Sequence, residues 1–158
     1  GVVRHRRDLV VSLSNVGEAH CRNRADAAAQ QSLVEAIALA RNLVDDFPSA
    51  PGLQDLLAGV LNNYASALET AGQLHQALSA YAEAVDVQQR IVAAAPARAD
   101  QGRLSTQYLN YSRALRSAGQ NREAERILQI RNNLIAQLQI HRPPADAPDI
   151  QAQTKSKP

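Results

Sequence analysis

The chain has 158 residues, of which 45% are hydrophobic and 20% charged, and a net charge of +2. Its single cysteine excludes an intrachain disulfide framework, and no apolar run approaches the roughly 20 residues that span a bilayer. Basic and acidic residues are interspersed, which argues against a dedicated nucleic-acid-binding face. We therefore expect a cytoplasmic protein that binds neither nucleic acid nor a membrane.

Several residue types recur at a constant interval along the chain. An asparagine, an alanine, a proline and a small residue each occur three times along the chain. In each case the second occurrence is 48 residues after the first, and the third is 47 residues after the second. A period in this range is typical of helical or propeller arrays. The recurring residues are Asn15, Asn63 and Asn110; Ala29, Ala77 and Ala124; Pro48, Pro96 and Pro143; and the small residues Gly17, Ala65 and Ser112.

In chain order, apolar residues at three- and four-residue steps predict six helices. They are expected at about residues 6–22, 25–46, 53–71, 73–95, 102–118 and 121–141. The sequence therefore predicts an all-α fold of three helical hairpins, at residues 4–51, 52–98 and 99–142. The second helix of each hairpin is expected to be longer than the first by about a turn or more.

The expected helix ends carry turn residues. Gly72 and Gly119 are expected to adopt the left-handed conformation that closes a helix, and Asn23 is expected to do so in the first hairpin. The recurring prolines end the second helices, because proline lacks an amide hydrogen. The remaining residues, 143–158, are rich in proline and polar residues and are expected to be disordered.

The repeat unit resembles the tetratricopeptide repeat, in a long-period form similar to kinesin-light-chain-type arrays of bacteria. The second unit carries the resemblance, which extends over about residues 6–142. This resemblance implies an α-solenoid with a right-handed superhelix, in which the first helices line a concave groove for a partner. The matching residues are Asn62-Asn63-Tyr64-Ala65, Ala71-Gly72-Gln73, Ala77, Tyr81 and Ala84.

Carried over to this chain, the groove positions of that family fall on the first helices. An asparagine amide carries both a donor and an acceptor, so the three repeating asparagines would pair with the backbone of a bound peptide. The alternative is that these amides bond neighbouring helices and fix the repeat spacing. The expected groove residues are Asn15, Glu18, Arg22, Asn62, Asn63, Ser66, Thr106, Asn110 and Arg113.

Arginines on two first helices are a possible anion site. Arg22, Arg113 and Arg116 could hold a carboxylate or an acidic peptide, because guanidinium pairs with carboxylates in a fork. A plain solvated face is the alternative, as it is for the basic run Arg4–Arg7. One further feature is Gln88, a polar break in the apolar face of the helix at 73–95.

No catalytic, cofactor or metal site is expected. The four histidines are too scattered for a metal centre, Cys21 is expected to be a packed apolar residue, and no phosphate-binding glycine loop or catalytic triad is present. The leading hypothesis is a scaffold that binds a peptide or partner protein. The alternatives are a regulatory or sensory arm of a larger bacterial signalling protein, such as a serine/threonine kinase, and a structural spacer or self-association module.

Overall fold

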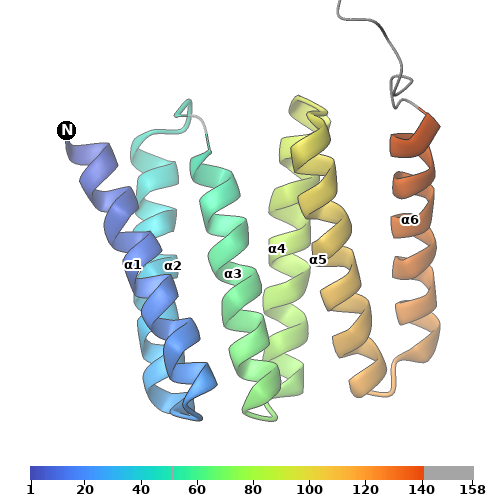
Figure 1. The fold of residues 1–158 in the computed structure, drawn as a ribbon, viewed down its shortest axis with the longest axis horizontal. Coiled ribbons are helices and arrows are strands. Elements are labelled where there is room, and N and C mark those ends of the chain that lie inside the picture. Colours follow the sequence, from blue (N-terminus) through green and yellow to red (C-terminus); the bar gives the residue numbers. More distant parts are fainter. Residues whose placement is uncertain (51, 141–158) are drawn as a thin grey trace, which may run out of the picture.

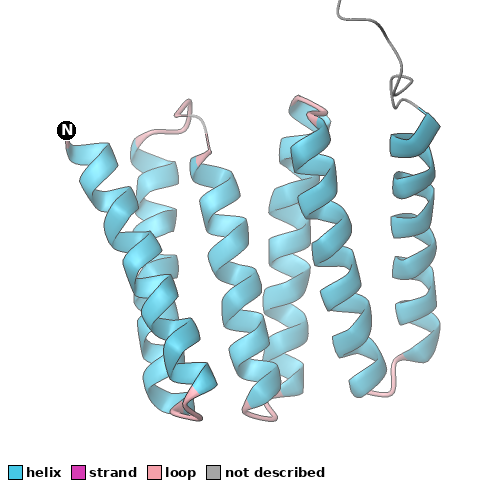
Figure 2. Ribbon diagram, viewed as in Figure 1, coloured by secondary structure: helices cyan, strands magenta, loops and turns pink. Residues whose placement is uncertain are grey.

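The computed structural model describes residues 1–50 and 52–140, and this part of the chain is entirely helical with short connections (Figure 2). The predicted all-α fold of six helices is confirmed. The helices are α1 (Val2–Arg22), α2 (Asp26–Asp46), α3 (Leu53–Thr70), α4 (Leu74–Ala94), α5 (Arg98–Ser117) and α6 (Asn121–Ile140).

The helices stand side by side in chain order, from α1 at one end of the molecule to α6 at the other (Figure 1). Each packs antiparallel on the next, and α1 also contacts α3. The pairs α1–α2, α3–α4 and α5–α6 are joined by short turns. The arrangement is that of an extended array, while the right-handed superhelix stays a prediction.

The buried side chains form a stripe that crosses the hairpins rather than one central core. The first cluster joins Val10 of α1 to Leu33 and Leu43 of α2 and continues to Ala84 and Val87 of α4. Two further clusters join α3 and α4 to α5 and α6. Because an array buries its apolar surface mainly between neighbouring units, this distribution is expected for stacked hairpins.

The turn inside each hairpin closes its first helix with the same pair of backbone hydrogen bonds. In the second hairpin, the amide of Gly72 donates to the carbonyl of Glu69 at 3.0 Å and that of Gln73 to the carbonyl of Leu68 at 2.8 Å. This is the Schellman arrangement, which requires a positive φ at the residue after the cap. Gly72 and Gly119 have this φ, 76° in each case.

The prediction for the first hairpin is wrong by one residue. Asn23 has φ −88°, and the left-handed residue is Arg24, with φ 56°. Arg24 is 48 residues before Gly72 and makes the equivalent hydrogen bond, to the carbonyl of Cys21 at 3.0 Å. The register of the repeat therefore decides which residue turns, and the preference of asparagine for the left-handed region does not.

The predicted difference in helix length, about a turn or more, is found in the second hairpin but not in the other two. The first and second helices have 21 and 21 residues in the first hairpin, 18 and 21 in the second, and 20 and 20 in the third. The two first helices α1 and α5 begin about one turn earlier than expected, at Val2 and Arg98. The charged residues before Gly102 therefore belong to a helix rather than to a connector, and Asp100 lies in its first turn, where the helix dipole favours a carboxylate.

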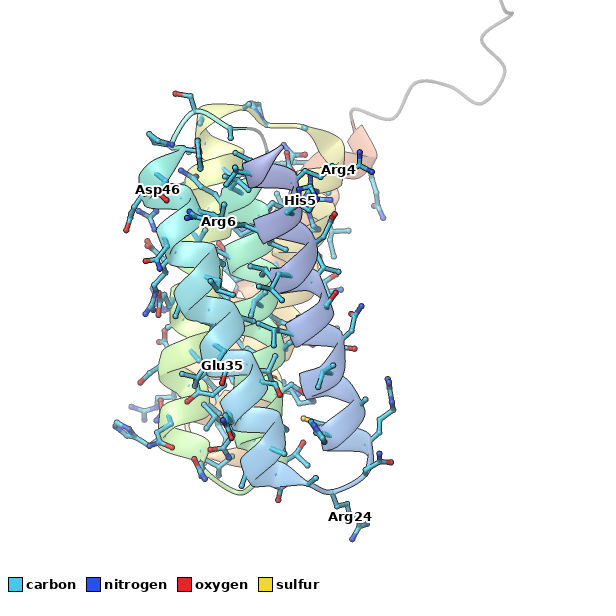
Figure 3. All side chains as sticks on the ribbon, turned by 90° about the vertical axis from the view of Figure 1, so that its left-hand side faces the viewer. Arg4, His5, Arg6, Arg24, Glu35 and Asp46 are labelled. Atoms are coloured by element: carbon cyan, nitrogen blue, oxygen red, sulfur yellow. The ribbon has the colours of Figure 1, made fainter. Side chains whose placement is uncertain are left out.

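Some sequence predictions lie outside the described residues, namely the end of the third repeat at Arg142, the stop at Pro143 and the tail at 143–158. Among the described residues, no helix combines the length and the apolar character needed to cross a membrane. The basic run Arg4–Arg7 is exposed on the first turns of α1, and Arg6 forms an ion pair with Asp46 at 2.7 Å (Figure 3). This pair links the start of α1 to the end of α2, but both side chains are about half exposed, so it contributes little to stability.

Replacing Arg24 with glycine is expected to stabilise the chain by about 1 kcal/mol, because a side chain in the left-handed region is strained. Figure 3 shows Arg24 at the turn between α1 and α2, directed away from the helices. The free energy of unfolding from urea titrations would measure the gain. Asn23→Gly is the matched control, and a gain from this control instead of Arg24→Gly would contradict the assignment.

A second pair of glycine variants tests the packing inside the first hairpin. A Cβ added at Gly17 would lie 2.5 Å from Cγ of Leu33, so Gly17→Ala is expected to cost about 1–3 kcal/mol. A Cβ at Gly59 meets nothing within 4 Å, so Gly59→Ala is expected to stabilise α3 by about 0.5–1 kcal/mol. If both variants changed the thermal unfolding temperature equally, the contact with Leu33 would not be what excludes a side chain at position 17.

Candidate functional site

A cavity of about 290 Å³ opens between the first helices of all three hairpins, and we call it the central cavity. Its walls come from α1, α3 and α5, and one residue of α4 closes it from behind. The polar side chains that line it belong mostly to positions predicted from the sequence. The lining residues are Glu18, Cys21, Arg22, Asn62, Asn63, Ser66, Tyr81, Asn110 and Arg113.

A second cavity of about 470 Å³ adjoins the first and lies between α3 and α5, and we call it the α3–α5 cavity. Asn62 and Asn63 line both cavities, so the two form one continuous surface. This second cavity is lined by Asp55, Gly59, Asn62, Asn63, Gln88, Ala99, Gly102, Arg103, Thr106 and Gln107.

The structure brings the predicted groove residues together, with one exception. Seven of them line the central cavity, and Thr106 lines the α3–α5 cavity beside Asn62 and Asn63. Asn15 is exposed on α1 and lines neither. It lies one repeat before Asn63, whose amide bonds to the preceding first helix, and among the described residues no first helix precedes α1.

The asparagine amides make hydrogen bonds from one first helix to the preceding one. The Nδ2 of Asn63 donates to Ser14 Oγ at 3.1 Å and to Glu18 Oε1 at 2.5 Å, and the Nδ2 of Asn110 donates to Asn62 Oδ1 at 3.0 Å. Ser14 and Asn62 are equivalent in the repeat, being 48 residues apart. The same hydrogen bond is therefore made twice. Each asparagine bonds to the residue that immediately precedes the repeating asparagine of the previous hairpin, Ser14 before Asn15 and Asn62 before Asn63.

This pattern supports the alternative in which the amides fix the spacing of the repeats. It does not remove the residues from the candidate site, because both asparagines also line the central cavity. The bonded amides act as rigid parts of the cavity wall, since each is held by a neighbouring helix.

Two arginines give the central cavity its positive groups. Arg22 of α1 and Arg113 of α5 line it and are exposed, whereas Arg116 does not line it. The carboxylate of Glu18 already accepts a hydrogen bond from Asn63. The two guanidinium groups, which come from opposite walls, are therefore the groups that a bound carboxylate would meet.

Tyr81 closes the back of the central cavity and is 1% exposed. Its hydroxyl donates to Glu69 Oε2 at 3.1 Å. Burial, and then the negative charge of Glu69, raises the pKa of Tyr81 to about 12. The side chain is therefore neutral at physiological pH, and it packs against Ala65 and Ala114 between neighbouring hairpins.

Cys21 is partly buried at the edge of the same cavity. Burial raises the pKa of its thiol, and the nearby carboxylates of Asp26 and Glu18 raise it further. A protonated thiol is a poor nucleophile. In the part of the chain that the structure describes, no three histidine, cysteine, aspartate or glutamate side chains are grouped so that they could hold a metal ion.

Sequence reasoning missed most of the α3–α5 cavity. Gln88 is recognisable as a polar break in an apolar helix face, but its neighbours Gln107, Gly102 and Arg103 carry no such signal. They meet only because α4 packs on α5. No family model, curated protein or solved structure matches this chain.

Replacing both Asn63 and Asn110 with alanine removes three hydrogen bonds and is expected to lower the free energy of unfolding by about 3 kcal/mol, because each net hydrogen bond contributes about 1 kcal/mol. Asn15→Ala is the control. An exposed substitution of this kind changes stability by less than about 0.5 kcal/mol. Chemical unfolding followed by circular dichroism would measure all three chains, and a loss as large from Asn15→Ala would contradict the inter-repeat role.

Proposed function

We propose that the chain is a protein–protein interaction scaffold that binds a peptide segment of a partner along its first helices. The observation that carries this proposal is the continuous surface of the central and α3–α5 cavities, joined at Asn62 and Asn63. It is concave and is lined by polar side chains from four helices, α1, α3, α4 and α5. A site with several fixed polar groups suits the backbone and side chains of an extended peptide.

The chemistry of the central cavity favours a ligand with a carboxylate at this point. Arg22 and Arg113 approach it from α1 and α5. An arginine pairs with a carboxylate through two parallel hydrogen bonds, which add geometric specificity to the charge attraction. The expected ligand is therefore a peptide with an aspartate, a glutamate or a free carboxyl terminus seated between the two arginines.

The experiment is a selection from a random peptide library displayed on phage, followed by calorimetry with the purified chain. We expect the selected peptides to contain an acidic residue. Ser66 is exposed and lines the central cavity, so Ser66→Leu should fill the binding surface. We expect it to weaken binding at least about tenfold, which corresponds to 1.4 kcal/mol.

Ser79→Leu is the matched control. Ser79 is also an exposed serine inside a helix of the second hairpin, but it lines a separate cavity of about 400 Å³ between α2 and α4. The control should bind the peptides as the unmodified chain does. A selection without binders, or peptides that respond to Ser79→Leu and not to Ser66→Leu, would overturn the proposal.

A further inference from the structure

Two glutamines at the inner wall of the α3–α5 cavity have amide oxygens without a hydrogen-bond partner. Gln88 of α4 is 0% exposed and Gln107 of α5 is 6% exposed, and both line the cavity. The side-chain oxygen of each is buried and unpaired, while the Nε2 of Gln88 donates to the backbone carbonyl of Asp100 at 3.5 Å. A buried acceptor without a partner is costly, so both oxygens call for a donor.

The same interface occurs earlier in the array without these glutamines. Gln88 is equivalent to Ala40, 48 residues before it, and Gln107 is equivalent to Val60, 47 residues before it. Ala40 and Val60 are 1% and 2% exposed, and both belong to one apolar cluster. Stacking of the hairpins therefore does not require polar groups at these positions, and the two glutamines need another explanation.

Two glycines keep the cavity open. Gly59 lies inside α3 and Gly102 inside α5, and a Cβ added to either would meet nothing within 4 Å. Glycine inside a helix lowers its stability, and here no close packing requires it. Gly17 differs in this respect, because Leu33 occupies the space beside it. The missing side chains at Gly59 and Gly102 instead leave room for a ligand.

The charges at the mouth of the cavity favour a cation. Arg103 forms an ion pair with Asp55 at 2.6 Å and a second one with Asp100. Asp100 lies outside the cavity lining, but its ion pair means that Arg103 is shared between two carboxylates. Asp55, which lines the cavity, is therefore only partly neutralised, and a positively charged group beside it is attracted.

We propose that the α3–α5 cavity binds an arginine side chain of the peptide that occupies the central cavity. The guanidinium carries five N–H donors in a planar fork, enough to supply a donor to each of the two glutamine oxygens. This inference rests on the proposed function, because Asn62 and Asn63 connect the two cavities and a single extended peptide would cross both. The ligand then has its acidic group near Arg113 and its arginine near Gln88.

The first experiment is an NMR titration of the ¹⁵N-labelled chain with the probe N-acetyl-Gly-Arg-Gly-amide. We expect saturable shifts of the side-chain amides of Gln88 and Gln107. The lysine peptide should bind at least about tenfold more weakly, because an ammonium lacks the planar fork, and the norleucine peptide should not bind. Equal binding of the lysine or norleucine peptide, or no saturable shift because the two oxygens bind ordered water only, would overturn the proposal.

Two variants test the cavity without removing the fold. Gly59→Leu places a side chain in the open space and should abolish arginine binding. Gln88→Ala combined with Gln107→Val installs the pair that the chain already uses at Ala40 and Val60, and it should remove the preference for arginine over norleucine. Ser79→Leu is again the control, and unchanged arginine binding in both cavity variants would overturn the proposal.

The library-selected peptides separate this inference from the proposed function. If they bind and respond to Ser66→Leu, but replacing their arginines with norleucine has no effect, the arginine site is wrong and the scaffold stands. If no selected peptide binds while the arginine probe still shifts Gln88 and Gln107, the scaffold is wrong and the arginine site stands alone.

Discussion

The close approach of the two helices in each hairpin is the contact on which the rest of the structure depends. Ala29, Ala77 and Ala124 are all 0% exposed and lie in the first turns of the three second helices. Their small side chains bring each second helix close to its first helix, where Gly17 lies against Leu33. Because close packing tolerates little added volume, the hairpins have a fixed thickness and the array a fixed repeat.

Because the repeat is constant, the contact between a second helix and the next first helix occurs twice, with different side chains in it. Between the first and second hairpins, Ala40 and Val60 close the contact as part of an apolar cluster. Between the second and third, Gln88 and Gln107 take their places and a cavity opens. In both cases the second helix of one hairpin packs on the first helix of the next, whereas the contact of α1 with α3 has no counterpart of the same extent between α3 and α5. The small residues inside the hairpins fix the packing of the helices. Side chains between the hairpins can therefore change and form a binding site without altering that packing.

The fold was largely predictable from the sequence, but the limits of some elements and the second cavity were not. Periodic apolar residues predict the six helices, whereas the first turns of α1 and α5 carry polar and charged residues that interrupt this pattern, so little marks Val2 and Arg98 as first residues. The left-handed Arg24 is visible only in the repeat register. Most groove positions were found because they recur, while Gln107 and Gly102 become a site only through the contact of α4 with α5.

The repeating asparagines connect the architecture to the candidate site. A hydrogen bond from Asn63 to Ser14 and one from Asn110 to Asn62 set the distance between successive first helices. That distance fixes the width of the central cavity, and with it the separation of Arg22 on α1 from Arg113 on α5. The two interpretations of these residues are therefore not exclusive. An amide that holds the repeat spacing also positions the charges that a ligand would meet, because both depend on the same contact between first helices.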